Sequence, residues 1–332
     1  LAIPFTYGSV LRLLGQQGLY LRSVKVVEDI QRITDIILDK TGTLTLAGHH
    51  HVVATMEDLH PTEASIILGM VQQSRHPKSR SLAQYFIGHG VEAGAINGIQ
   101  EIPGKGLKYQ EKANTYLVGS ANFCGLKHRI NSDVFISING HCKAAFHLDP
   151  ELRSGIVSTL RDLGKKFQLH LLSGDKGVTR HIWEDFIDPS QVKFQQSPFD
   201  KQTYTKNLQE KDRHVLMVGD GLNDTGALKM AQVGIAVSDD LSAFSPACDG
   251  ILHGQNIGAF AKLLSFIKAS RWVLYWCYLL AIAYNIIGLS FAVQGLLSPL
   301  VAAILMPLSS LTIVLVSVAG THLQSRLFWS KK

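Results

Sequence analysis

Two long uncharged segments near the carboxyl end of the chain limit its possible folds more than any other feature. Residues 272–294 and 297–319 are each a run of 23 residues without a formal charge. A helix of about 20 apolar residues crosses the hydrocarbon core of a bilayer, so the pattern predicts two transmembrane helices. Only Gly295 and Leu296 join them, which predicts a tight hairpin. The length of both runs disfavours the alternative, a helical hairpin of a soluble protein.

Basic residues outside the two runs indicate how the hairpin is oriented. They precede the first run and follow the second, at Lys262, Lys268, Arg271, Arg326, Lys331 and Lys332. Lys and Arg are enriched on the cytoplasmic side of membrane helices. We therefore expect both flanks to be cytoplasmic and the turn to lie on the other side of the membrane.

Asp39 is the second informative feature. It directly follows the apolar run Ile36-Ile37-Leu38 and begins the sequence Asp39-Lys40-Thr41-Gly42-Thr43-Leu44-Thr45. A carboxylate at the carboxyl end of a buried strand can attack the terminal phosphate of ATP and hold it as an acyl phosphate. The seven-residue sequence resembles the phosphorylation motif of the P-type ATPases. The resemblance implies that Asp39 is the phosphorylated residue, with Lys40 and Thr41 in the same catalytic site.

Thr41 distinguishes this interpretation from its main alternative, a soluble phosphatase of the haloacid dehalogenase class. Such phosphatases usually carry a second Asp two residues after the nucleophile, and this residue activates the water that destroys the intermediate. A threonine hydroxyl cannot act as that base. Thr41 therefore favours a phosphoenzyme that survives long enough to drive a conformational cycle, as a pump requires.

Further candidates for phosphate chemistry lie downstream, in the order that the resemblance requires. Ser173-Gly174-Asp175 could hold phosphoryl oxygens through a hydroxyl and the backbone N–H groups of a turn. Lys201 supplies a cation for the same oxygens. The run from Gly219 to Asp224 follows a predicted buried strand and adds Asn223 to the catalytic set.

The same run supplies two candidate ligands for Mg²⁺. Asp220 and Asp224 offer hard oxygen atoms, which suit this ion. The resemblance implies that Asp39 and Thr41 complete the magnesium site. ATP and Mg²⁺ are therefore the expected cofactors.

A long insertion separates the two parts of this site. The distance from Asp39 to Ser173 is 134 positions (173 minus 39), far too many for one crossover connection in a parallel sheet. Strand-like alternation and glycines occupy residues 47–140. This segment resembles the nucleotide-binding domain of P-type ATPases, and His76-Pro77 resembles the pair that marks their heavy-metal branch. The resemblance implies that ATP contacts five residues: His76, Pro77, Gly104, Gly106 and Gly119.

The match in the insertion has two departures and leaves alternatives open. Val71 stands where the family often has an acidic residue, and Ser120 stands where many relatives have Asn. Without the flanking motifs, His76 would be interpreted as a capping or surface histidine. The cluster His49-His50-His51 offers three imidazoles, but consecutive strand residues point to opposite faces and chelate poorly.

Polar residues inside the predicted membrane helices suggest which metal is transported. Tyr284 and Asn285 lie in the first helix, and Met306, Ser309 and Ser310 share one face of the second at i, i+3 and i+4. They resemble the Tyr-Asn and Met-x-x-Ser-Ser pairs of copper-transporting members. A soft thioether favours Cu(I), with Zn²⁺, Cd²⁺ and Ag⁺ as alternatives. Such residues also pack between membrane helices without binding metal.

The beginning of the chain resembles part of another membrane helix. Residues 1–14 are mostly apolar but contain Arg12 and are too short to span a bilayer. We expect a fragment whose upstream half is absent, and the resemblance implies that this half carries an actuator domain and the first metal-site helix. The resemblance to bacterial members implies a multi-pass inner (plasma) membrane protein with cytoplasmic domains, which exports its metal and has a soluble copper chaperone as a partner.

These features predict an α/β fold, and the resemblance implies that it is of the haloacid dehalogenase type. A phosphorylation domain of residues 34–46 plus 141–256 is expected to be a doubly wound parallel sheet, and an α+β nucleotide-binding domain of residues 47–140 is inserted into it. Residues 1–33 are expected to end a membrane helix and form a connector, and residues 257–332 to form a connector helix and the two transmembrane helices. The net charge of +6 is explained by membrane flanks and phosphate-facing lysines, and predicts no nucleic-acid partner. The four cysteines form no Cys-x-x-Cys pair, which fits a reducing cytoplasm.

Overall fold

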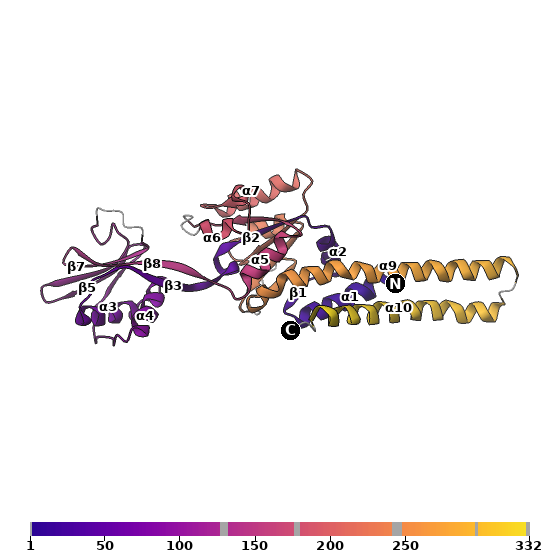
Figure 1. Cartoon of the computed structure of the whole chain (residues 1–332), viewed down its shortest axis with the longest axis horizontal. Coiled ribbons are helices and arrows are strands. Elements are labelled where there is room, and N and C mark those ends of the chain that lie inside the picture. The colour runs from indigo at the N-terminus through magenta and orange to yellow at the C-terminus, as the bar shows by residue number, and fades with distance from the viewer. Residues whose placement is uncertain (1, 127–131, 176–179, 241–247, 296–297, 330–332) are drawn as a thin grey trace. The chain divides into compact units, whose positions relative to one another are not determined.

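The chain folds into two compact units. The computed structural model describes residues 2–126, 132–175, 180–295 and 298–329. One unit comprises Leu1–Leu44 with Arg153–Lys332, and the other comprises Thr45–Leu152 (Figure 1). Each unit has its own sheet and its own hydrophobic core, as expected of an inserted domain.

A seven-stranded sheet forms the centre of the first unit. Its order is β1-β13-β12-β11-β2-β9-β10, and all neighbouring strands are parallel except β1 and β13. From β2 the chain order runs outward to β9 and β10 on one side and to β11, β12 and β13 on the other, with β1 added at the edge, which confirms the predicted doubly wound sheet. The strands are Leu19–Leu21 (β1), Asp35–Asp39 (β2), Gln168–Leu172 (β9), Val192–Lys193 (β10), Val215–Gly219 (β11), Val233–Ser238 (β12) and Gly250–His253 (β13).

Helices cover this sheet. Every residue of β2 and β11 is buried, which explains why these strands are almost continuously apolar. Ile156, Leu160 and Leu163 of α5 are buried on one face, as their helical spacing predicts. The short helices are Val24–Arg32 (α2), Lys40–Leu44 (η1), Ile156–Gly164 (α5), Arg180–Glu184 (α6), Pro189–Gln191 (η2), Pro198–Gln209 (α7), Thr225–Met230 (α8) and Gly254–Ala259 (η3).

The second unit is an antiparallel sheet with two helices. The strand order is β3-β8-β7-β6-β5-β4, and residues of α3 and α4 form its main core with the sheet, around Phe86 and Phe146. This confirms the predicted α+β insertion. The elements are Thr45–Glu57 (β3), Pro61–Gln73 (α3), Pro77–Gly88 (α4), Gln100–Ile102 (β4), Gly106–Glu111 (β5), Asn114–Gly119 (β6), Val134–Ile138 (β7) and His141–Leu152 (β8).

The boundary of the insertion differs from the expected one. We expected the phosphorylation domain to resume at residue 141, but β8 belongs to the sheet of the second unit. It pairs with β7 on one side and with β3 on the other, from Thr45 opposite Leu152 to Glu57 opposite Ala144. Residues 45–46 and 141–152 therefore move from the first unit to the second. The sequence pattern of residues 141–152 is compatible with a strand in either sheet. Only the observed strand pairing shows to which sheet this strand belongs.

Three helices extend from the first unit (Figure 1). They are Ala2–Gln16 (α1), Phe260–Val293 (α9) and Pro299–Trp329 (α10), and α1 packs against both others. α9 and α10 are long and apolar enough to cross a membrane, and only 6% of the most apolar stretch of each is buried. Apart from Gln294 and Ser298, the described residues of the predicted spans 272–294 and 297–319 fall within α9 and α10. Residues 296–297 and the flanking lysines Lys331 and Lys332 lie outside the described residues.

α9 is continuous from the α/β part into its apolar stretch. The expected connector helix and the first span are one helix of 34 residues. Its first turns are tied to the α/β part: Gln31 Nε2 donates to Ile267 O at 2.5 Å, and Lys268 Nζ donates to Ile33 O at 3.0 Å. Lys268 also lies 4.4 Å from the centre of the Phe167 ring. These polar contacts hold the base of the helix on the domain that contains Asp39.

Candidate active site

The carboxyl ends of three neighbouring strands meet at one edge of the parallel sheet. Asp39 ends β2, Ser173 follows β9 and Asp220 follows β11. Because β9 and β11 flank β2, the segments after these strands converge. They enclose a cavity of about 230 Å³, lined by Asp39, Thr41, Gly174, Asp175, Gln196, Pro198, Lys201, Asp220, Asn223 and Asp224. Eight of these ten residues are candidates that the sequence indicates.

Lys201 lies between two carboxylates in this cavity. Its Nζ donates to Asp39 Oδ1 at 2.5 Å and to Asp224 Oδ1 at 2.7 Å, and all three residues are buried. The start of α7 places Lys201 here. Ser197 is the N-cap, and its Oγ accepts a hydrogen bond from the backbone N–H of Asp200, which fixes the first helical turn beside the strand ends.

The cluster carries more negative than positive charge. Burial and repulsion from Asp224 raise the pKa of Asp39 to about 7, although Lys201 opposes the shift. Burial likewise raises the pKa of Asp224, and Asp220 adds to the repulsion. Burial lowers the pKa of Lys201, but Asp39 and Asp224 raise it by more, so this ammonium stays protonated. An additional cation would relieve the remaining repulsion.

One carboxylate oxygen indicates that a divalent cation fits here. Asp224 Oδ2 is buried without a hydrogen-bond partner in the described structure, and a Cβ at Gly219 would lie only 2.6 Å from it. Carboxylate oxygens suit Mg²⁺. In the part of the chain that the structure describes, no three acidic, histidine or cysteine side chains form a ready metal site. In this structure the Lys201 ammonium occupies the space between Asp39 and Asp224. The fit to Mg²⁺ is therefore argued from the chemistry of the carboxylate oxygens and not from their positions.

The loop after β9 arranges its polar groups in two ways. Gly174 and Asp175 line the cavity, whereas Ser173 is fully buried and its Oγ accepts a hydrogen bond from the Asp175 N–H at 3.2 Å. Lys40 is also buried and forms an ion pair with Asp175. Ser173 and Lys40 thus support the loop, while their neighbours reach the cavity.

Some residues of this region are not indicated by the sequence. Gln196 lines the cavity because its N–H donates to Ser173 O at 2.9 Å, a contact across 23 positions (196 minus 173) that no local pattern reveals. Pro198 lines it as part of the α7 cap, which is a local signal. Thr43 Oγ1, in the loop after Asp39, is buried and has no hydrogen-bond partner among the described groups.

Residues 35–232 match the family of haloacid dehalogenase-like hydrolases. The match covers more than half of the chain and includes every residue that lines the cavity. The chain belongs to the haloacid dehalogenase-like hydrolases.

This hydrolase is similar to longer proteins along nearly its whole length. It is 28% identical over 324 residues to the nitrogen fixation protein FixI of Rhizobium leguminosarum bv. viciae, which covers 95% of this chain and 42% of the relative. It is 27% identical over 320 residues to a copper-exporting P-type ATPase of Staphylococcus haemolyticus, which covers 90% of this chain and 39% of the relative. The chain thus spans less than half the length of these relatives.

Two solved structures share the fold of this hydrolase. A zinc-transporting PIB-type ATPase in its E2.Pi state gives a TM-score of 0.80 at 19% identity, and covers 96% of this chain and 55% of the other. The catalytic domain of the CPx-ATPase CopB-B gives a TM-score of 0.59 at 25% identity, and covers 76% and 98%. The predicted fold class is confirmed for the phosphorylation sheet, the inserted domain and the two carboxyl-terminal helices together.

In the second unit of the hydrolase, His76 and Pro77 start a helix. His76 is the N-cap of α4, and its Nδ1 accepts a hydrogen bond from the Lys78 N–H at 3.2 Å, while Pro77 occupies the first turn. The His76 side chain is exposed. The capping role that the sequence left open is therefore present, and it leaves the imidazole accessible to a ligand.

The three glycines of the candidate nucleotide site differ in their constraints. A Cβ at Gly106 would lie 2.2 Å from Val118 O, and one at Gly119 would lie 2.3 Å from Lys105 O. These two glycines are needed because β5 and β6 approach closely where they pair. Gly104 has a φ of +71° and open space around it. Its conformation favours glycine, but its side-chain position is free.

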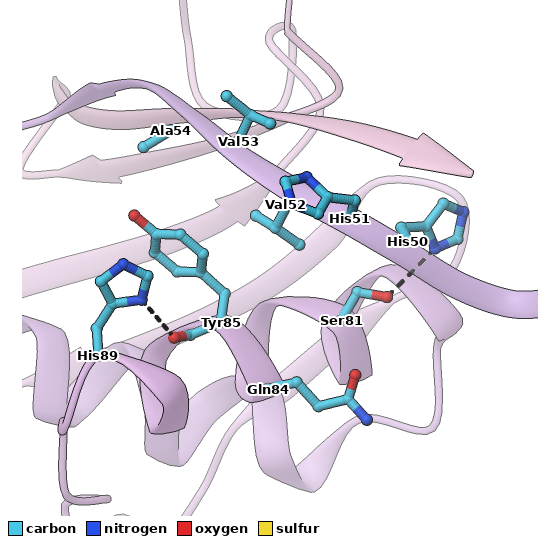
Figure 2. Close-up of a pocket in the computed structure, with 9 residues that line it drawn as sticks. All are labelled: His50, His51, Val52, Val53, Ala54, Ser81, Gln84, Tyr85 and His89. Atoms are coloured by element: carbon cyan, nitrogen blue, oxygen red, sulfur yellow. Dashed lines mark hydrogen bonds between the residues drawn. The ribbon is translucent and has the colours of Figure 1, made fainter. Parts of the chain in front are cut away.

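A larger hollow lies elsewhere in this unit, between β3 and α4 (Figure 2). At one end His50 Nδ1 lies 3.2 Å from Ser81 Oγ, and at the other His89 Nδ1 lies 2.8 Å from Tyr85 O. The hollow measures about 540 Å³, and its lining includes neither His76 nor Gly104, Gly106 or Gly119. The described cavities therefore do not bring the candidate nucleotide residues together.

The candidate metal residues lie on two different helices. Tyr284 in α9 turns toward α10, where its hydroxyl is 3.3 Å from Thr312 Oγ1, a residue that the sequence did not indicate. Ser309 and Ser310 are half-buried. Met306 is 72% exposed and Asn285 is exposed, on helix surfaces that no described element covers. The structure brings Tyr284 to α10 but gives no contact between Asn285 and Met306.

Proposed function

We propose that this hydrolase is the catalytic and carboxyl-terminal membrane portion of a heavy-metal-transporting P-type ATPase, and that Asp39 accepts the phosphoryl group of ATP. The observation that carries the proposal is the buried pair of Asp39 and Lys201 at the end of the central strand, beside Thr41. The similarity of the chain to a copper-exporting P-type ATPase and the two exposed apolar helices support the same function.

The geometry suits an in-line transfer to Asp39. An ionised Asp39 oxygen would attack the γ-phosphorus of ATP, the bond to the bridging oxygen would break, and ADP would leave with the electron pair. Lys201 is placed to offset negative charge on the phosphoryl oxygens, since its ammonium already lies 2.5 Å from Asp39 Oδ1. Asp39, Asp220 and Asp224 would hold Mg²⁺, which supplies further positive charge to the same oxygens.

A soluble phosphatase of the same family remains the alternative. Two observations disfavour it. Thr41 lines the cavity at the position where a phosphatase needs a carboxylate to activate water. In addition, the exposed apolar surface of α9 and α10 would be costly in water.

The inserted unit is proposed to bind ATP. His76 offers an exposed imidazole, oriented by its bond from the Lys78 N–H, and Gly104 offers open space at a turn. Pro77 fixes the backbone beside the imidazole, while Gly106 and Gly119 allow the tight strand pairing beneath Gly104. The similar catalytic domain of CopB-B, which changes conformation upon nucleotide binding, supports this role.

We further propose Cu(I) as the transported ion. Met306 supplies a soft thioether on α10, with Ser309 and Ser310 one turn further along, and Tyr284 and Asn285 lie on α9. The name of the Staphylococcus haemolyticus relative supports copper, whereas the PIB-type ATPase of similar fold transports zinc. Zn²⁺, Cd²⁺ and Ag⁺ are therefore the competing cargoes.

The location is proposed from the charge pattern of α9. Lys268, near its base, donates a hydrogen bond to Ile33 O in the α/β part that holds Asp39, and Arg271 follows at the start of the apolar stretch. Basic residues at this end of a span favour the cytoplasm. The α/β part of the first unit and the whole second unit are therefore proposed to be cytoplasmic at an inner membrane, with export as the direction of transport. A soluble copper chaperone as donor rests on the family resemblance alone.

The test is direct phosphorylation. With γ-³²P-labelled Mg-ATP, the pump containing this chain should form a hydroxylamine-sensitive phosphoenzyme, and Asp39→Asn should abolish it because the amide is not a nucleophile. Asp162→Asn is the matched control, since Asp162 is an exposed carboxylate on α5 that pairs only with Lys165 in the described contacts. Undiminished labelling of the Asp39→Asn protein would refute the assignment.

A further inference from the structure

Arg153 joins three segments of the α/β unit that are distant in sequence. Its Nη1 and Nη2 donate to the two carboxylate oxygens of Asp239 at 2.7 and 2.8 Å, and Nη2 also donates to the carbonyl of Gly42 at 2.9 Å. Its backbone N–H donates to Leu44 O at 2.9 Å. Arg153 is only 4% exposed, so this is a buried, built contact and not a solvated surface charge.

The Gly42 carbonyl belongs to the loop that follows Asp39. This loop, Lys40–Leu44, departs from helical geometry at Thr41 and at Gly42, which has a φ of +77°. Glycine reaches positive and negative φ with similar ease, so the local sequence alone does not hold one conformation. A hydrogen bond from a fixed, buried donor selects one. The Arg153 guanidinium is such a donor, and it binds the loop three residues from Asp39.

The surroundings keep the guanidinium in place. A bidentate pair with Asp239, whose side chain is 55% exposed, fixes the plane of the buried guanidinium. Gly254 provides the necessary room, since a Cβ there would lie 2.2 Å from Asp239 Oδ1 and 2.3 Å from Arg153 Nη1. Arg153, Asp239 and Gly254, which come from separate segments, thus together make possible the hydrogen bond from Arg153 to the Gly42 carbonyl.

We infer that Arg153, held by Asp239, is a positioning residue that fixes the loop Lys40–Leu44 so that Asp39 and Thr41 face the phosphoryl donor. It does not touch the reacting atoms. The inference rests on the proposed function for its effect on phosphorylation, but not for its effect on the loop itself.

The loop is tested first, without phosphorylation. Amide hydrogen exchange of residues 40–44, followed by mass spectrometry, should be about tenfold or more faster in Arg153→Met, because a charge-assisted hydrogen bond is lost. Exchange in β2 and β11 should stay unchanged, which also shows that the variant is folded. Gly254→Ala keeps both charged residues but displaces them, and should accelerate exchange in the same segment. Unchanged exchange at 40–44 in both variants would overturn the inference.

The matched control is Arg22→Met. Arg22 also pairs with an aspartate, Asp249, at 2.7 Å in the same unit, but its side chain is 63% exposed. We expect this variant to leave exchange at 40–44 at the wild-type rate. Acceleration equal to that in Arg153→Met would mean that the loop responds to any lost ion pair, and would also overturn the inference.

Phosphorylation is tested with two donors, ATP and acetyl phosphate, because the small donor needs no nucleotide site. Gly254→Ala and Arg153→Met should lower the rate of phosphoenzyme formation about ten- to a hundredfold with both donors at saturation, while the Kd for ATP stays unchanged. A defect with ATP alone would place the effect in nucleotide binding and refute a role in the loop. If the wild type accepts phosphate from neither donor, the proposed function fails, while hydrogen exchange still decides the role of Arg153.

Discussion

Thr41 is the single residue whose replacement should change the reaction most specifically. Thr41→Asp would place a carboxylate two residues after Asp39, inside the cavity that Thr41 lines. A positioned general base contributes about 10²–10⁴-fold, so we expect the acyl phosphate to decay at least about tenfold faster. The measurement is the decay of labelled phosphoenzyme after a chase with unlabelled ATP. Thr41→Asn has nearly the same shape without a base, and an equal acceleration in this control would contradict the explanation.

Residue by residue, the sequence indicates those parts of the site that follow strand ends. Asp39, Asp175 and Asp220 could be placed together because the carboxyl ends of parallel strands share one edge. Arg153 and Gln196 could not, because their contacts depend on how distant loops pack. The Ser173 hydroxyl was expected to be able to hold phosphoryl oxygens, and in the structure its Oγ accepts a hydrogen bond from the Asp175 N–H, while Lys40 pairs with Asp175.

At the scale of single elements, the turn between β4 and β5 offers a test of nucleotide binding. Gly104 and Gly98 both have positive φ, +71° and +85°, and open space around them. Changing either to Ala should therefore cost a similar free energy of unfolding, about 1–2 kcal/mol. Only Gly104→Ala should weaken ATP binding, by roughly fivefold in Kd or more. Isothermal titration calorimetry measures this, and equal affinities in both variants would remove Gly104 from the nucleotide site.

A buried network between strands predicts how stability depends on pH. His170 of β9 lies 3.0 Å from Asp35 Oδ1 of β2 and 2.9 Å from the Tyr204 hydroxyl. Burial lowers the pKa of His170 despite its contact with Asp35. Burial opposes ionisation of Asp35, but hydrogen bonds from Thr34, His170 and Arg213 lower its pKa overall. Both groups therefore bind protons more weakly in the folded chain than in the unfolded chain.

The sign follows from linkage. In the unfolded chain His170 becomes protonated near pH 6.5 and Asp35 near pH 3.9, roughly. In the folded chain each becomes protonated only at a lower pH. The free energy of unfolding should therefore fall as pH drops below about 6.5. His170→Gln should make the fall between pH 7 and 5 shallower, while costing about 1–3 kcal/mol at pH 7. Thermal unfolding measures both effects, and a slope between pH 7 and 5 equal to that of the wild type in His170→Gln would contradict this explanation.

Elements were predictable where a local pattern sets them, and less so where pairing or packing does. Local patterns were sufficient to predict two elements: the helical spacing of Ile156, Leu160 and Leu163 predicted α5, and the apolar run before Asp39 predicted β2. The place of β8 was not, because an alternating strand fits either sheet until its partners are known. The continuity of α9 was also expected, since the segment with Lys262, Lys268 and Arg271 was predicted to continue as a helix into the first apolar run.

At the scale of the whole molecule, the cargo is the main prediction. In the pump that contains this chain, Cu(I) and Ag(I) should stimulate ATP hydrolysis more than Zn²⁺ or Cd²⁺, because a thioether is a soft ligand. Met306→Ala should raise the Cu(I) concentration for half-maximal stimulation about 10- to 100-fold. Ile304→Ala, also exposed on α10, is the matched control. Stimulation by Zn²⁺ alone, or no effect of Met306→Ala, would exclude this copper site.

The unbroken length of α9 has a mechanical consequence. A helix of 34 residues is about 51 Å long, and its base is fastened to the α/β part by Gln31 and Lys268. From Lys268 to Val293 the helix measures 26 residues, about 39 Å, so if a change near Asp39 tilted it by about 5° at these contacts, the far tip would move sideways by about 3 Å. The helix would then act as a rigid lever, in which a small rotation at the base produces a larger displacement at the far end. Such a displacement could change the distances between the side chains around a bound ion. No residue inside the bilayer would have to bend.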